Sequence, residues 1–203
     1  MKSSCFLIVL MLMPYVSRAQ ENAGWLENVK EYQLEANHHF ADPETSILDE
    51  EDLKRFTGLQ FYEINPQFRV DAIFTRTPDE KPFKMPTSTK RKPLYVKYGE
   101  LSFTIKLQDF VLNVYKSLDS FDDPEYKDYL FLPFTDLTSG DGSYGGGRYI
   151  DLFIPEGNTI EIDFNKAYNP YCAYSNNYSC PIPPRANDLK IRIEAGVKDF
   201  GHY

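Results

Sequence analysis

Apolar side chains recur at helical spacing near the start of the chain, and their period then changes to two. Between residues 22 and 40 they recur every three or four positions, at Trp25, Val29, Tyr32, Ala36 and Phe40. This spacing predicts an amphipathic helix, and Asn22 is available to cap its first turn. A shorter helix is predicted next, with Asp49 as its N-cap and with Leu53 and Phe56 facing inward.

From Leu59 onward, apolar and polar residues alternate or form short aromatic runs, as is typical of β-strands. The predicted strands cover residues 60–64, 68–76, 94–98, 101–107, 109–115, 128–134, 148–154, 159–165 and 188–195. Turn residues separate them, and Tyr98-Gly99-Glu100 predicts a tight hairpin turn. We therefore expect a mainly β (β-rich α+β) fold, an antiparallel sandwich or barrel-like sheet with an N-terminal helix.

The first residues have the pattern of a secretory signal peptide. Lys2 supplies a positive charge, an apolar run follows from Cys5 to Met13, and Ser17-Arg18-Ala19 places small residues at a cleavage site. The run is shorter than the ~20 apolar residues of a membrane span. We expect cleavage after Ala19 and export to the periplasm or the extracellular space. An uncleaved anchor is the alternative, because Arg18 lies close to the cleavage site.

The rest of the chain is then expected to be soluble, with no membrane span after cleavage. Residues 20–57 form the predicted helical segment, and residues 58–203 form a single β-rich domain. The formal net charge of the whole chain is −8 at pH 7. An acidic surface repels phosphate backbones, so nucleic acid is not an expected partner.

Two cysteines remain after the leader, Cys172 and Cys180. In an oxidising compartment, a lone pair so close in sequence favours a disulfide bond. The alternatives are two free thiols or half of a metal site. The metal alternative has little support, because His38, His39 and His202 are far away in the sequence. We therefore expect no metal and no cofactor.

Two unusual sequence blocks suggest a family resemblance. They are YGGGRYIDL, which begins at Tyr144, and DFNKAYNPYCAY, which begins at Asp163. Together with FTGLQFY, PFTDLTSG and CPIPP, they resemble the bacterial domain of unknown function family 1684, from about Phe56 to Lys198. The family carries no established activity, so the resemblance implies a related fold and no chemistry. Many of its members place Glu where this chain has Val197, which leaves Glu194 and Asp163 as nearby carboxylates.

The first block is a candidate anion site. Backbone N–H groups of Gly145, Gly146 and Gly147 can converge on a negative group beside Tyr144, and the Arg148 guanidinium can bind the same group with two parallel hydrogen bonds. The structural alternative is a glycine bulge that leads into a strand, with Arg148 paired to an internal acid such as Asp136 or Asp151. The sequence supports both interpretations.

The second block is a candidate sugar site. Amide groups of Asn165 and Asn169 and the ring of Tyr168 are suited to hold polar ring compounds. The alternative is that these side chains fill a β-rich core. Three carboxylates, Asp136, Asp163 and Glu194, are candidates for acid/base catalysis. Turn capping and a calcium loop over residues 136–141 are the other roles considered for the acidic residues.

Cysteine or serine hydrolase chemistry is not expected, because no histidine lies within the predicted strand region. The leading hypothesis is a binding module for a small polar, anionic or sugar-like ligand, held by the loops over residues 136–148 and 163–185. A carboxylate-dependent hydrolase that acts on glycans or related envelope molecules is the first alternative. A structural or accessory envelope protein is the second. The oligomeric state is not predicted.

Overall fold

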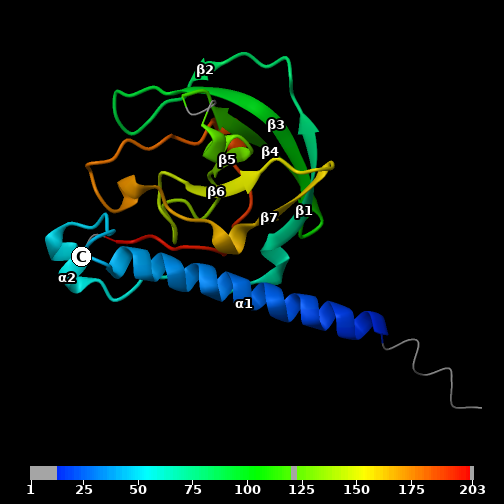
Figure 1. Ribbon diagram of the computed structural model, residues 1–203, viewed down its shortest axis with the longest axis horizontal. Helices are drawn as coiled ribbons and strands as arrows, with labels where there is room; N and C mark the ends of the chain where they lie inside the picture. The colour runs from blue at the N-terminus through cyan, green and yellow to red at the C-terminus, as the bar shows by residue number, and fades with distance from the viewer. Residues whose placement is uncertain (1–12, 120–122, 202–203) are drawn as a thin grey trace, which may run out of the picture.

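The computed structural model describes residues 13–119 and 123–201, so residues 1–12 of the predicted signal peptide lie outside it. A curled antiparallel sheet forms a half-barrel, and helix α1 (Met13–Ala41) runs beneath it (Figure 1). The strands of the sheet follow the order β6-β5-β4-β3-β1-β7, and β2 pairs with β3. This architecture confirms the expected mainly β fold with an N-terminal helix.

The strands are β1 (Arg69–Arg76), β2 (Phe83–Lys84), β3 (Leu94–Ile105), β4 (Gln108–Ser117), β5 (Tyr129–Phe134), β6 (Arg148–Phe153) and β7 (Thr159–Asp163). Besides α1 the described residues form α2 (Glu50–Arg55) and the short 3-10 helices η1 (Pro66–Phe68), η2 (Pro124–Tyr126), η3 (Phe164–Lys166), η4 (Tyr171–Ala173) and η5 (Arg185–Asn187). Among these helices, none has the length and apolar character that a membrane crossing requires.

Both predicted helices are present, but the first is longer than its apolar spacing indicated. Because α1 begins at Met13, Asn22 lies within the helix and does not cap it. The predicted cap of α2 is confirmed, since the Asp49 carboxylate accepts hydrogen bonds from the backbone N–H groups of Glu51 and Asp52. The predicted inward face of α1 is also confirmed, with Val29 and Phe40 buried.

The hairpin predicted at Tyr98-Gly99-Glu100 is wrong, because β3 runs through these residues without a turn. Gly99 lies at a register shift between β3 and β4, where a side chain would approach the backbone of β1. The chain turns instead at Lys106 and Leu107, whose φ angles are 49° and 65°. Positive φ at both central residues is the geometry of a tight hairpin turn, which Gly or Asn usually adopts.

Two predicted strands are replaced by irregular chain. Residues 60–64 contribute an isolated bridge between Phe61 and Val197, and residues 188–195 contribute another between Thr135 and Asp188. The alternation in 188–195 still reflects burial, because Leu189 and Ile193 belong to the main core. Their backbone groups bond partly to side chains instead of a neighbouring strand. The two-residue strand β2 was not predicted from the sequence.

The sheet buries side chains on both faces. On β6, Ile150 and Leu152 belong to the main hydrophobic core, whereas Tyr149 belongs to a separate aromatic cluster with Met85, Tyr115 and Phe131. Successive residues of a strand point to opposite faces, so β6 divides the two clusters. The second face, which we call the aromatic face, lacks a covering sheet and is approached by α1 and by the chain after β7 (Figure 1).

Hydrogen bonds fasten α1 at several points along its length. The indole N–H of Trp25 donates to the Asp163 carboxylate at 2.7 Å. Lys166 donates to the Asn28 side chain at 2.6 Å, and the Asn37 side chain accepts from the backbone N–H of Leu59 at 2.6 Å. These contacts set the distance between the helix and the aromatic face.

We predict that Gly99→Ala destabilises the protein by about 1–3 kcal/mol, because the added methyl group would overpack the contact between β3 and β1. The new Cβ would lie 2.8 Å from the Thr75 carbonyl oxygen and against the Phe74 ring. Gly157→Ala is the matched control, because a Cβ there meets nothing within 4 Å. Urea unfolding compares the two variants, and equal stabilities would contradict the assigned bulge.

Candidate functional site

A pocket of about 610 Å³ opens between α1, the aromatic face and the chain from residue 168 to residue 181. This volume falls within the ~300–1,000 Å³ that is usual for small-molecule sites. Its lining residues are Tyr32, Glu35, Ala36, His39, Phe40, Tyr95, Tyr129, Phe131, Tyr149, Asp151, Tyr168, Pro170, Tyr171, Tyr178, Ser179, Cys180 and Pro181. Most of the lining is therefore aromatic, with few charged groups.

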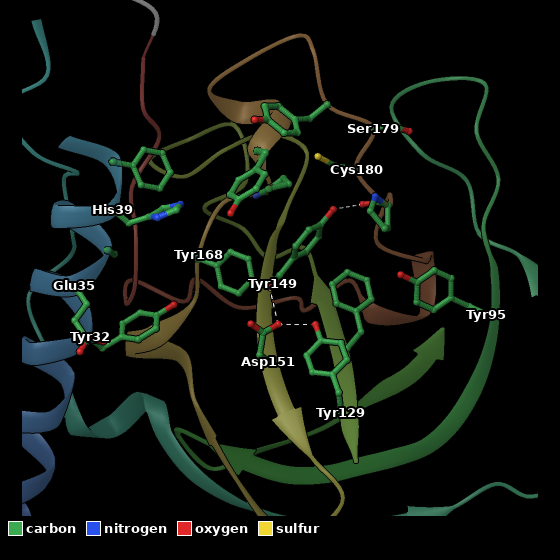
Figure 2. Close-up of a pocket in the computed structure, with 17 residues that line it drawn as sticks. Tyr32, Glu35, His39, Tyr95, Tyr129, Tyr149, Asp151, Tyr168, Ser179 and Cys180 are labelled. Atoms are coloured by element: carbon green, nitrogen blue, oxygen red, sulfur yellow. Dashed lines mark hydrogen bonds between the residues drawn. The ribbon is translucent and has the colours of Figure 1, made fainter. Parts of the chain in front are cut away.

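Asp151 is the polar centre of this pocket. One of its carboxylate oxygens, Oδ1, accepts hydrogen bonds from the hydroxyls of Tyr129 and Tyr168, each at 2.6 Å (Figure 2). Burial strongly raises the pKa of both tyrosines, and the negative charge of Asp151 raises it further. Both hydroxyls therefore stay protonated and hold the carboxylate in place.

Helix α1 supplies the wall opposite the sheet. Tyr32, Glu35 and His39 are spaced three and four residues apart, so they share one face of the helix. Figure 2 shows them on one side of Asp151, with Tyr95 and Tyr129 on the other. Burial raises the pKa of Tyr32, and the Asp151 charge adds to this shift. The Tyr32 hydroxyl thus remains a neutral donor and acceptor at the pocket.

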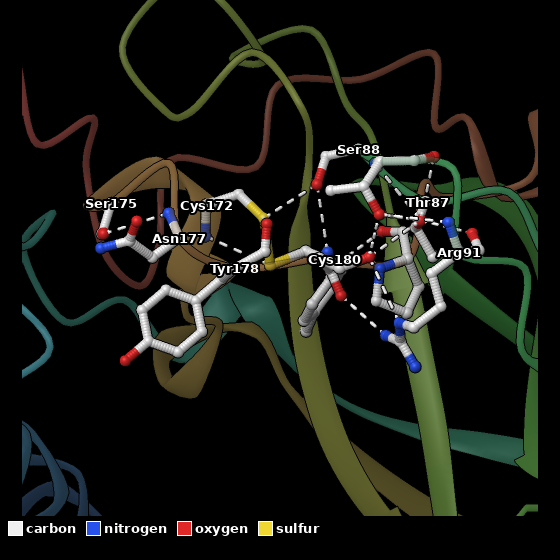
Figure 3. The surroundings of a disulfide bond; sticks show 12 residues. Thr87, Ser88, Arg91, Cys172, Ser175, Asn177, Tyr178 and Cys180 are labelled. Atoms are coloured by element: carbon white, nitrogen blue, oxygen red, sulfur yellow. Dashed lines mark hydrogen bonds between the residues drawn. A yellow bond between two sulfur atoms is a disulfide. The ribbon is translucent and has the colours of Figure 1, made fainter.

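The rim of the pocket is a loop that begins and ends near the two cysteines. The sulfur atoms of Cys172 and Cys180 lie at disulfide-bonding distance, with their Cα atoms 6.1 Å apart, as the sequence predicts (Figure 3). The neighbouring segment is tied to this loop, because Ser88 N–H donates to the Cys180 carbonyl at 2.9 Å and Arg91 donates to the Ser179 carbonyl at 2.7 Å. The rim is thereby held against the sheet.

A smaller cavity of about 160 Å³ lies behind the pocket and shares Tyr32, Asp151 and Tyr168 with it. Asp163 and Lys166 also line this cavity. The three shared residues therefore form the partition between the two spaces. Because Asp151 faces both spaces, a change at this residue alters the polarity of both.

Arg148 lies on the opposite face of β6, away from the pocket. Its side chain has 0% exposure and forms an ion pair with Asp136 at 3.1 Å, and the Asp136 side chain is also 0% exposed. Its guanidinium further donates to the carbonyls of Ile193 and Ala195. The structure thus contains the alternative that the sequence left open, a glycine bulge followed by an internally paired arginine.

The remainder of the glycine block offers no joint site with Arg148. Gly145 and Gly146 are exposed, whereas Gly147 is buried with a φ of 88° and its Cα faces the Phe134 carbonyl. Tyr144 packs against the cluster formed by α1, α2 and the C-terminal segment. The three glycine amides and the guanidinium therefore do not converge on one ligand position.

The three carboxylates proposed for catalysis are not brought together. Asp136 is paired with Arg148 in the core, and Glu194 is exposed and forms an ion pair with Arg192 at 3.2 Å. Asp163 accepts hydrogen bonds from Trp25 and from the side chain of Asn165. Each carboxylate has a separate structural partner, so the arrangement gives no acid/base pair among these three.

Of the polar residues predicted to hold a sugar, Tyr168 lines the pocket. Asn165 is buried and bonds both backbone groups of Asn65, and the buried Asn169 donates to the Lys198 carbonyl. The described residues contain no group of three or more His, Cys, Asp or Glu arranged to hold a metal ion.

Sequence analysis missed several pocket residues, namely Tyr32, Glu35 and His39 as site residues of the helix, and Tyr129, Tyr149 and Asp151 on the sheet. The signal for the sheet residues was present in the alternation of β6. It predicts that Tyr149 and Asp151 share a face, and Arg148 must then point to the other one. Of the two adjacent histidines, both are exposed, and His39 lines the pocket.

Comparison with known proteins identifies a family. The sequence profile of the family described as "Protein of unknown function (DUF1684)" matches residues 54–198. The chain belongs to this family. The resemblance expected from about Phe56 to Lys198 is therefore confirmed. Tyr129, Tyr149, Asp151 and Tyr168 lie within the matched segment, whereas the pocket residues of α1 precede it.

The fold is similar to the solution NMR structure of an uncharacterised protein from Haloarcula marismortui. The two chains are 31% identical, with a TM-score of 0.70, and the alignment covers 90% of this chain and 99% of the other. No curated protein matches the chain. Both similarities concern the DUF1684 fold, and neither supplies an activity.

We predict that Arg148→Met lowers the free energy of unfolding by roughly 3–5 kcal/mol, because it leaves the Asp136 carboxylate charged and unpaired in the core. The double variant Arg148→Met/Asp136→Leu should lose less than the sum of the two single losses, since it removes both charges. Urea unfolding measures all three variants.

Arg192→Met is the control for this prediction, because Arg192 forms its ion pairs with Asp141 and Glu194 at the protein surface. Exposed pairs contribute little, so its loss of stability should be much smaller. If Arg148→Met were as stable as Arg192→Met, the core ion pair would not have the structural role assigned to it.

Proposed function

We propose that the protein binds a small organic molecule in the pocket between α1 and β6. The observation that carries this proposal is a preformed space whose aromatic walls converge on one carboxylate, Asp151. Apolar walls with a few placed polar groups are the usual composition of a ligand site. The walls provide contact area, and the carboxylate orients the ligand.

The polar groups of the pocket are positioned before a ligand arrives. The second carboxylate oxygen of Asp151 is left for a ligand, because both tyrosine hydroxyls bond to Oδ1. Each hydroxyl oxygen also keeps an acceptor position. A fixed carboxylate lowers the entropic cost of binding, since its rotamer is already set.

The charges of the lining favour a neutral or cationic ligand over an anionic one. Asp151 and Glu35 are acidic, and no Lys or Arg is among the described lining residues. The expectation of an anionic ligand depended on Arg148, whose guanidinium is paired with Asp136 in the core. A sugar-like ligand remains compatible with this lining, because tyrosine rings stack on sugars and carboxylates accept their hydroxyls.

The glycan hydrolase and the structural envelope role have less support. A hydrolase of the expected type would need two carboxylates at a working separation. Asp136, Asp163 and Glu194 have separate partners at separate places, as described above. A purely structural protein would have no need for an open pocket with an ordered carboxylate.

We also propose that binding takes place outside the cytoplasm, in the periplasm or the extracellular space. Two features support this location: the signal-like pattern up to Ala19, and the Cys172 and Cys180 sulfurs at bonding distance in the pocket rim. An oxidising compartment favours such a bridge. Because Cys180 lines the pocket, the bridge would also stiffen the binding wall.

We predict that Ala36→Phe abolishes ligand binding, because the larger side chain fills the pocket from α1. Ala36 lines the pocket, whereas Leu34 is 58% exposed on the same helix and lies outside the lining. Leu34→Phe is therefore the matched control. Saturation-transfer NMR with a library of cationic, neutral and anionic fragments measures binding to both variants and to the wild type.

The expected result is a set of fragments that bind the wild type and Leu34→Phe and lose their signal with Ala36→Phe. Circular dichroism confirms that both variants are folded. A library without any fragment that depends on Ala36 would contradict the proposed function, as would fragments that bind all three proteins equally.

A further inference from the structure

Building on the proposed binding function, we infer that the ligand of this pocket carries a positive charge and is an organic ammonium ion. The inference combines three features of the same space: a carboxylate without a cationic partner, aromatic rings on several sides, and tyrosine hydroxyls that remain protonated. Each of them favours a cation over a neutral molecule of the same shape.

Asp151 is a charged group without a counter-charge in the protein. Its described hydrogen bonds come from two neutral hydroxyls, and no Lys or Arg in the described part of the chain forms an ion pair with it. Lys166 in the adjoining cavity donates to Asn28. Arg91 near the rim donates to Ser179. The nearest cations are therefore engaged elsewhere.

Glu35 adds a second acidic group from the helix wall, and it too has no ion pair within the described residues. His39 is the one lining residue that can take up a positive charge, and its side chain lies on the exposed side of α1. When a ligand displaces water from the pocket, the negative potential of the carboxylates becomes stronger. A cation relieves this potential, whereas an anion worsens it.

The aromatic rings enclose the space on more than one side. The Phe131 and Tyr149 rings lie 4.7 Å apart at 76°, and the Tyr149 and Tyr168 rings lie 5.8 Å apart at 89°. Tyr95 continues the wall beyond Phe131, at 5.9 Å. Rings that meet at steep angles present faces and edges to one enclosed volume. Ring faces are electron-rich and attract ammonium groups, and several such faces form an aromatic cage.

The hydrogen-bonding pattern supports the same ligand class. The Tyr129 and Tyr168 hydroxyls direct their protons to Asp151, so they present lone pairs to the pocket. These groups accept hydrogen bonds from a ligand but have no proton left to donate. A ligand with N–H or N–CH₃ groups matches this lining, and a ligand with carboxylate or phosphate oxygens does not.

The test compares three probes of nearly equal shape by isothermal titration calorimetry. Choline carries the ammonium charge, 3,3-dimethylbutan-1-ol replaces its nitrogen with carbon and is neutral, and 3,3-dimethylbutanoate is an anion. We expect choline to bind about tenfold or more tightly than the neutral probe, from the combined charge and cation–π attraction. The anion should bind most weakly.

Asp151→Asn should remove most of this preference while leaving affinity for the neutral probe within about twofold, because Asn keeps the size and an acceptor oxygen but not the charge. Asp79→Asn is the matched control, since Asp79 is an exposed turn residue outside the pocket. Tyr168→Phe is the second variant. It keeps the ring and removes one hydroxyl bond to Asp151, and it should weaken choline binding less than Asp151→Asn.

The outcomes separate this inference from the function on which it depends. Equal or tighter binding of the neutral or anionic probe would overturn the cationic ligand and leave the binding function intact. Failure of all three probes, together with Ala36-dependent fragments that are neutral or anionic, would also overturn it. If no fragment binds in an Ala36-dependent manner, the proposed function itself fails. A choline preference that persists in Asp151→Asn would show that Asp151 does not recognise the charge.

Discussion

The ion pair between Arg148 and Asp136 is the constraint on which the two sides of the sheet depend. Both side chains are fully buried, so neither charge is tolerated without the other. The guanidinium also donates to the Ile193 and Ala195 carbonyls, and Asp136 accepts from the Ile193 N–H at 2.7 Å. The C-terminal segment is therefore held by side chains where a strand would be held by a neighbouring backbone. Because Arg148 must face this core, Tyr149 and Asp151 face the other side.

The pocket follows from that division, since three separate parts of the chain meet on the aromatic face. The sheet provides Asp151 with its two tyrosine partners, α1 provides Tyr32 and Glu35, and the cysteine loop provides the rim. The hydrogen bond from Trp25 to Asp163 joins α1 to the end of β7. A site assembled from rigid elements holds its carboxylate at a fixed position, which is the condition for selective binding without a large ordering cost.

Local patterns in the sequence predict much of this fold. The period of two identifies five strands closely, and Asp49 and the cysteine pair have the predicted roles or positions. The errors occur where tertiary contacts decide the structure. Gly99 is a bulge because β1 approaches it, and residues 188–195 are not a strand because Arg148 and Asp136 take their backbone bonds. The alternation of β6 separates its two faces but does not reveal which face is closed, so the site was assigned to Arg148 and not to Asp151.

The most direct measurement is a crystal structure of the protein grown with arsenocholine, in which arsenic replaces the ammonium nitrogen of choline. Anomalous scattering from arsenic locates the cation without reference to the shape of the density. The account predicts one anomalous peak in the pocket, between the Asp151 carboxylate and the rings of Tyr129, Tyr149 and Tyr168. An empty pocket, or a peak confined to acidic groups on the outer surface, would contradict it.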